Sequence, residues 1–65
     1  MPSTVIRSFE YDAATRELTV VFQSGRVYRY LDVPAEVVEA MRAVRAKGEY
    51  FNRQIRGVFE FVAET

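Results

Sequence analysis

Apolar and polar residues alternate along the first half of this chain. Between Glu17 and Gln23 every second residue is apolar, which is the period of a strand with one buried face. The neighbouring segments Thr4–Asp12 and Arg26–Leu31 are rich in β-branched and aromatic residues and are bounded by turn-forming residues. The pattern therefore predicts three consecutive antiparallel strands.

The loop between the second and third strands decides which way the two tyrosines of "RVYRYL" point. A two-residue loop would turn both rings away from the apolar face of the second strand. A three-residue loop, Gln23–Gly25, places its glycine third, where this type of hairpin needs a left-handed residue. That register brings Tyr28 and Tyr30 onto the face of Leu18 and Val20. We predict the three-residue loop, with both tyrosines under a helix.

Helical spacing replaces the alternation after the third strand. Pro34 suits the first helical position, and Gly48 suits a left-handed helix end, so the sequence predicts one main helix between them. Its buried stripe is predicted from the apolar positions at helical spacing: Val37, Ala40, Met41 and Val44. A ridge beside this stripe is predicted to carry Val38, Arg42 and Arg45.

The segment "GEYFNRQIR" predicts a short second helical turn near residues 50–57, with Asn52 as its N-cap and Ile55 pointing inward. Tyr50 and Phe51 are adjacent, so we expect one in the core and the other exposed. The alternating segment Val58–Ala63 either adds a fourth strand or lies as an extended tail. The predicted fold is α+β, a three- or four-stranded antiparallel β-meander covered by one main helix.

Composition supports one folded domain over residues 1–65, since 49% of the residues are hydrophobic and nine are aromatic. Cysteine and histidine are both absent from the sequence, which excludes disulfides and thiol nucleophiles and leaves a poor donor set for a metal. Lys47 is the only lysine, and the sequence has no glycine-rich phosphate loop or nucleophile motif. We expect no metal, no cofactor and no enzymatic activity.

The sequence has no apolar run near the ~20 residues of a membrane span, and its polar start lacks the apolar core of a signal peptide. We therefore expect a cytoplasmic protein that does not contact membranes.

Charge is balanced overall but unevenly distributed. Nine basic residues match nine acidic ones, yet residues 40–57 hold five basic residues and one acid, a net charge of +4. Eight of the nine basic residues are arginines, whose planar guanidinium fits phosphate. The sequence thus predicts a local basic patch on a neutral domain.

The run "LTVVFQSGRVYRYLDVP", with its Tyr-x-Tyr pair, followed by a helix and "GEYFNRQIR", resembles the KTSC domain over about Ile6–Phe61. That family is named for a C-terminal appendage of some lysyl-tRNA synthetases and also occurs as free-standing bacterial proteins, the form expected here. The resemblance implies a fold without established activity, for which RNA binding is the suggested role. The matching motif positions are Tyr28, Tyr30, Gly48, Tyr50, Phe51, Asn52, Ile55 and Arg56.

Two functions follow from these patterns. The first is binding of RNA, either tRNA or another structured RNA, with these residues as candidate contacts: Arg42, Arg45, Lys47, Tyr50, Phe51, Asn52, Arg53 and Arg56. Tyr28, Tyr30, Gly48 and Ile55 are expected to be structural, and the arginines have the alternative of a solvated helix face. The second function is protein interaction or homodimerisation through a sheet edge, suggested by a leftover apolar face at Val21, Val27 and Leu31.

Overall fold

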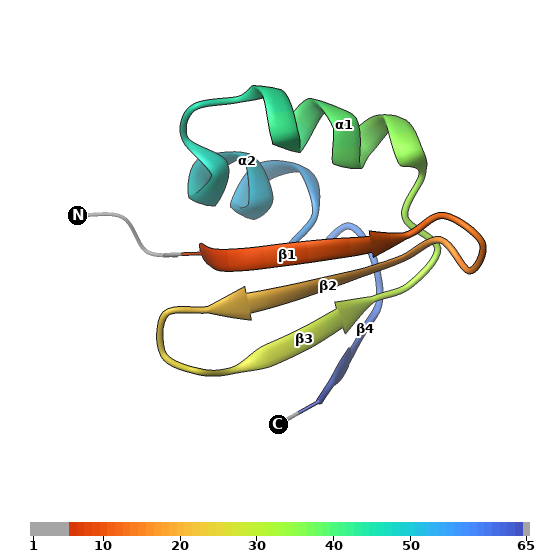
Figure 1. Ribbon diagram of the computed structural model, residues 1–65, viewed down its shortest axis with the longest axis horizontal. Coiled ribbons are helices and arrows are strands. Elements are labelled where there is room, and N and C mark those ends of the chain that lie inside the picture. The colour runs from red at the N-terminus through yellow and green to blue at the C-terminus, as the bar shows by residue number, and fades with distance from the viewer. Residues whose placement is uncertain (1–5, 65) are drawn as a thin grey trace.

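The computed structural model describes residues 6–64 and contains one four-stranded antiparallel sheet in the order β1-β2-β3-β4. Both helices pack on the same face of this sheet (Figure 1). The elements, in chain order, are β1 (Ile6–Asp12), β2 (Glu17–Phe22), β3 (Val27–Tyr30), α1 (Ala35–Ala43), α2 (Lys47–Gln54) and β4 (Phe61–Ala63). The α+β meander is confirmed with four strands, while Thr4 and Val5, which were assigned to the first strand, lie outside the described residues.

The β2–β3 hairpin has the predicted three-residue loop. Gly25 adopts a positive φ of 95°, and its N–H donates to the carbonyl of Phe22 at 2.8 Å. Leu18 pairs with Tyr30 and Val20 pairs with Tyr28, so the four side chains share one sheet face. The expectation that both tyrosines face the helices is confirmed.

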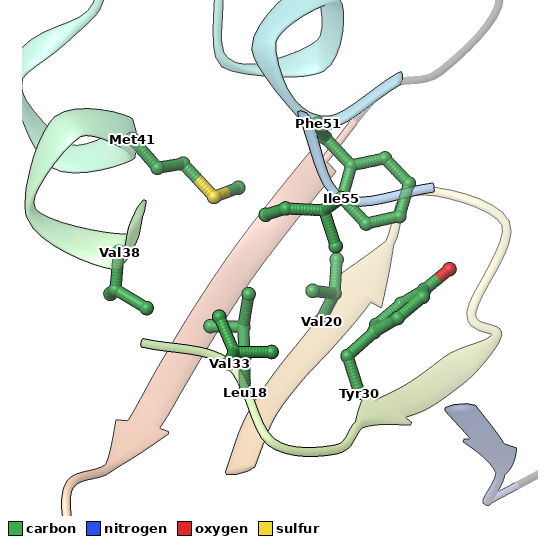
Figure 2. Close-up of a cluster of buried hydrophobic side chains, with 8 residues drawn as sticks. All are labelled: Leu18, Val20, Tyr30, Val33, Val38, Met41, Phe51 and Ile55. Atoms are coloured by element: carbon green, nitrogen blue, oxygen red, sulfur yellow. The ribbon is translucent and has the colours of Figure 1, made fainter. Parts of the chain in front are cut away.

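The core lies between this face and the two helices (Figure 2). Among residues 6–64, eight side chains are almost fully buried. They come from β2, β3, the β3–α1 connection, both helices and the C-cap of α2: Leu18, Val20, Tyr30, Val33, Val38, Met41, Phe51 and Ile55. At the edge of the core, two half-buried tyrosines donate hydrogen bonds to backbone carbonyls. Tyr11 Oη donates to the carbonyl of Val33 at 2.6 Å, and Tyr50 Oη donates to that of Val37 at 3.0 Å.

The main helix begins directly after Pro34, as predicted, but its predicted extension to Gly48 is wrong. α1 ends at Ala43, and Val44 has extended backbone angles (φ −82°, ψ 153°). Gly48 lies inside α2 and is not among the glycines with positive φ, so it ends no helix. The break turns the chain back on itself, so that α2 becomes a second element covering the sheet.

The predicted buried stripe of α1 is confirmed in part, since Met41 is fully buried and Val37 packs against the core. Val38 is fully buried with Met41, although it had been placed on the ridge beside the stripe. Ala40, by contrast, is exposed, and Val44 is only half-buried. With a helix of nine residues the apolar side chains are compatible with more than one buried direction, and the position of the sheet selects among them.

The predicted N-cap role of Asn52 is wrong as well, because α2 begins five residues earlier, at Lys47, with Ala46 as its N-cap. Asn52 instead accepts a hydrogen bond from Arg56 Nη1 at 3.4 Å near the end of that helix. Ile55 points inward and is fully buried, as expected.

The C-terminal segment forms a strand rather than a tail. Gly57, with φ of 79°, lies in the turn after α2, and β4 then pairs with β3. The N–H of Leu31 donates to the carbonyl of Glu60, and the N–H of Glu64 donates to that of Val27, both at 2.8 Å. β4 is therefore one edge of the sheet.

Candidate nucleic-acid interface

Two of the five basic residues between 40 and 57 are held by local contacts at the end of α1. Arg42 Nε lies 3.7 Å from a carboxylate oxygen of Glu39, the pairing expected from their spacing, and its guanidinium lies 5.6 Å from the centre of the Phe9 ring. Lys47 Nζ donates to the carbonyls of Val44 at 2.8 Å and Arg42 at 3.4 Å. Lys47 therefore satisfies carbonyl groups left free where α1 ends, a role the sequence pattern did not predict.

The other three basic residues, Arg45, Arg53 and Arg56, are exposed. Arg45 lies in the connection between the helices, Arg53 in the last turn of α2, and Arg56 just after it. Within residues 6–64 none of these three forms an ion pair with a carboxylate. Their guanidinium groups are therefore the most available positive charges of this segment.

The expectation that one of Tyr50 and Phe51 lies in the core is confirmed by Phe51, but the expectation that the other is exposed is wrong, because Tyr50 is half-buried. Phe51 is only 1% exposed, and its ring centre lies 5.4 Å from that of Phe22 and 5.3 Å from that of Tyr30. Tyr50 is half-buried and its hydroxyl is bonded to Val37 of α1. Because α2 packs against both the sheet and α1, Phe51 contacts rings of the sheet and the adjacent Tyr50 contacts α1.

Five aromatic rings form a closed circuit over β2, β3, β4 and α2. Successive centroids lie 5.0–5.4 Å apart, a separation typical of favourable aromatic pairs. The members, in order around the circuit, are Phe22, Tyr28, Phe61, Tyr30 and Phe51. Phe61 is 51% exposed at the edge of the circuit, and this aromatic was not among the candidates from sequence. Its exposure depends on the register of β4, which pairs Phe61 with Tyr30 on the helix-covered face at the point where the helices no longer reach.

Burial raises the pKa of the Tyr30 phenol, and the neighbouring Arg56 guanidinium offsets part of that rise because it favours the ionised form. Tyr30 is therefore neutral at physiological pH. The same interaction places the charge of Arg56 near the aromatic circuit.

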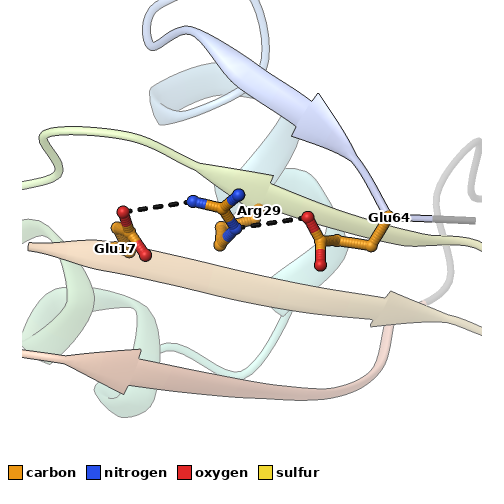
Figure 3. Close-up of polar contacts among 3 residues, drawn as sticks. All are labelled: Glu17, Arg29 and Glu64. Atoms are coloured by element: carbon orange, nitrogen blue, oxygen red, sulfur yellow. Dashed lines mark hydrogen bonds and ion pairs between the residues drawn. The ribbon is translucent and has the colours of Figure 1, made fainter.

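The face of the sheet that carries no helix is acidic. Arg29 lies between two glutamates, with Nη1 3.1 Å from Glu17 and Nε 3.2 Å from Glu64 (Figure 3). These two carboxylates raise the pKa of Arg29, which is thus fully charged. By strand alternation, Glu10 and Glu60 lie on the same side as these three residues. Arg29 therefore meets an excess of acid on this face.

Among residues 6–64, no group of three or more carboxylates is close enough to hold a metal ion, and no helix is long and apolar enough to cross a membrane.

Comparisons with known proteins agree with this arrangement, a small α+β domain with one helix-covered face and one open face. The model of the KTSC domain family matches residues 2–59, so the chain belongs to the KTSC domain family. The crystal structure of a KTSC domain protein from Yersinia pestis superposes with a TM-score of 0.89, at 28% identity, over all of this chain and 94% of the other.

The sequence relatives are of two sizes. A lysine–tRNA ligase of Nostoc punctiforme is 43% identical over 58 residues, which are 89% of this chain but 10% of the ligase. An uncharacterized protein of Stutzerimonas stutzeri is 42% identical over 53 residues, 82% of this chain and 75% of that protein. The chain thus spans about a tenth of the length of the curated ligases that it matches.

Proposed function

We propose that this chain is a non-catalytic binding module that contacts RNA through its helical layer. The observation that supports this most is the separation of charge between its two faces. The helical layer, residues 35–57, holds five basic and three acidic residues, a net charge of +2, and its segment 40–57 has a net charge of +4. The open face of the sheet carries four glutamates around Arg29. A polyanion is attracted to the first surface and repelled by the second.

The relatives support RNA as the class of partner. Lysine–tRNA ligases act on a tRNA, and three of them contain a region 38–43% identical to this chain. Because the match covers a tenth of their length, the proposal concerns contact with tRNA or another structured RNA and does not include the ligase reaction.

The positions of Phe51, which is buried, and Tyr50, which is half-buried, change how the contact is made. With these rings packed against α1 and the sheet, recognition depends mainly on phosphate contacts by Arg42, Arg45, Arg53 and Arg56. Each phosphate neutralised by such a side chain steepens the fall of log affinity with log salt concentration by about 0.7–0.9. The proposal therefore predicts weak sequence preference and strong salt dependence.

A titration of fluorescently labelled tRNA at about 50 mM and 200 mM salt tests this proposal. The double variant Arg45→Gln/Arg53→Gln should weaken binding about tenfold and reduce the salt slope by about 2. The matched control Arg16→Gln/Arg29→Gln removes the same charge from the β1–β2 turn and the open face, and it should change the affinity much less. Absence of binding at about 100 µM protein in low salt, or equal losses in both double variants, would overturn the proposal.

The alternative, protein interaction or homodimerisation through a sheet edge, is supported by a different feature. Three large apolar side chains, Val58, Phe61 and Val62, are 61%, 51% and 40% exposed around β4. Arg45, Arg53 and Arg56 do not belong to this surface, although Arg56 lies near Tyr30, whose ring contacts Phe61. The two functions therefore do not exclude one another. Light scattering over a concentration series tests the homodimer directly, because a monomer at the highest concentration eliminates it.

A further inference from the structure

We propose that the β4 edge binds an extended peptide segment with basic residues on either side of a small apolar one, which adds to the sheet as a fifth strand. This site specifies the protein-interaction alternative and does not depend on RNA binding. Its parts are the free backbone groups of β4, the apolar side chains around it and two flanking carboxylates.

The backbone of β4 is available for pairing. Glu60 and Glu64 bond β3 through their carbonyl and N–H groups, and Val62 pairs with Arg29 between them. In an antiparallel ladder the alternate residues point the other way, so the N–H and C=O groups of Phe61 and Ala63 point away from β3. β4 is the last strand of the sheet, so these groups can accept another strand.

The side chains around this edge are unusually apolar for a surface. Among residues 6–64 the exposed large hydrophobic residues are Val58, Phe61 and Val62. All three line one shallow groove, with Leu31 at its side. On β1, the opposite edge, the exposed residues are all polar: Arg7, Ser8, Glu10 and Asp12. Polar and charged residues protect a sheet edge against pairing, and β4 lacks this protection at its centre.

The charges beside β4 select the partner. Glu60 and Glu64 lie on the open face on either side of Val62, two residues away in each direction. An added strand places its own side chains directly opposite these positions, at a distance where opposite charges attract and like charges repel. A segment of the pattern basic-x-apolar-x-basic therefore meets Glu60, Val62 and Glu64 with complementary groups.

The same charges disfavour a second copy of the chain. In the antiparallel register that pairs both free residues, Phe61 lies opposite Ala63 of the other copy and Val62 lies opposite Val62. Glu60 then lies opposite Glu64 of the other copy, twice in each dimer. This like-charge contact is unfavourable, whereas the basic segment avoids it.

The test is an NMR titration of the ¹⁵N-labelled chain with the peptide Gly-Ser-Arg-Thr-Val-Thr-Arg-Ser-Gly. Its core reads the same in both directions, so it offers the matching charges in a parallel or an antiparallel orientation. We expect the amide signals of Phe61 and Ala63 to shift most, and the analogue with glutamates in place of both arginines to bind much more weakly. A second analogue with proline in place of both threonines should also fail to bind, because the threonines lie opposite Phe61 and Ala63 and proline has no N–H to donate to them.

Two charge-reversal variants distinguish binding at the β4 edge from a general attraction of the basic peptide to the acidic face. Glu60→Lys should weaken binding of the arginine peptide about threefold to tenfold, while Glu10→Lys, the same charge change on the far edge of that face, should change it less than about twofold. Neither replaced side chain is buried. Shifts centred on α2, equal binding of the acidic analogue, equal effects of both variants or no shift at about 5 mM peptide would overturn the proposal. Dimerisation of the unmodified chain through β4 would also overturn it.

Discussion

The hydroxyl of Tyr50 donates a hydrogen bond to the carbonyl oxygen of Val37 across 3.0 Å and so joins α2 to α1. Tyr50→Phe removes this bond and keeps the ring, and it should lower the free energy of unfolding by about 1 kcal/mol. The measurement is the midpoint of urea unfolding, monitored by circular dichroism. Tyr11→Phe, which removes the corresponding bond to Val33, should show a loss of similar size. An unchanged midpoint in Tyr50→Phe would mean that this bond does not stabilise the helix pair.

Val38→Ala tests which side of α1 is buried. Val38 is fully buried, so its truncation should cost about 2 kcal/mol, from lost burial and the cavity left behind. The control Val58→Ala makes the same chemical change at a side chain that is 61% exposed, and should cost less than about 0.5 kcal/mol. A larger loss in Val44→Ala than in Val38→Ala would instead support the helix face predicted from sequence.

Position 57 needs a glycine because of its backbone conformation, and not because a larger side chain would lack space. Its φ is 79°, and an added Cβ would meet no atom within 4 Å. Gly57→Ala should therefore destabilise the fold by about 1 kcal/mol through the left-handed conformation alone. Gly57→Asn should cost less, since asparagine adopts this region more readily. Equal unfolding midpoints for the alanine variant and the unmodified chain would contradict this.

Tyr30 should make the fold sensitive to alkaline pH. Its pKa is raised in the folded state, so the folded chain holds this proton more tightly than the unfolded chain, whose tyrosines titrate near about 10. The resulting stabilisation is complete below that pH and is lost as pH rises through the higher pKa of the folded state. Urea midpoints measured between about pH 8 and 11 should fall less steeply in Tyr30→Phe than in the unmodified chain. Parallel slopes would contradict the prediction, because the other tyrosines contribute equally to both.

The sequence determined the parts of this protein that depend on backbone period and turn chemistry. Alternation in β2 and the left-handed Gly25 were sufficient to set the hairpin register, and with it the inward direction of Tyr28 and Tyr30. Both signals lie within a few neighbouring residues, where local geometry leaves few options. The basic character of residues 40–57 was equally plain, since it needs only a count of charges.

Tertiary structure decided how the helical half meets the sheet and which side chains reach the surface. Because the chain breaks at Val44 and α2 packs against two surfaces, Phe51 is buried and Tyr50 is half-buried, although adjacent residues on an isolated helix would face different ways. Phe61 became exposed because β4 pairs with β3 beyond the reach of the helices. Such outcomes depend on contacts between segments that are distant in sequence. An amphipathic segment can bury more than one face, and the face that gives the most burial in the whole fold is selected, which no local pattern shows.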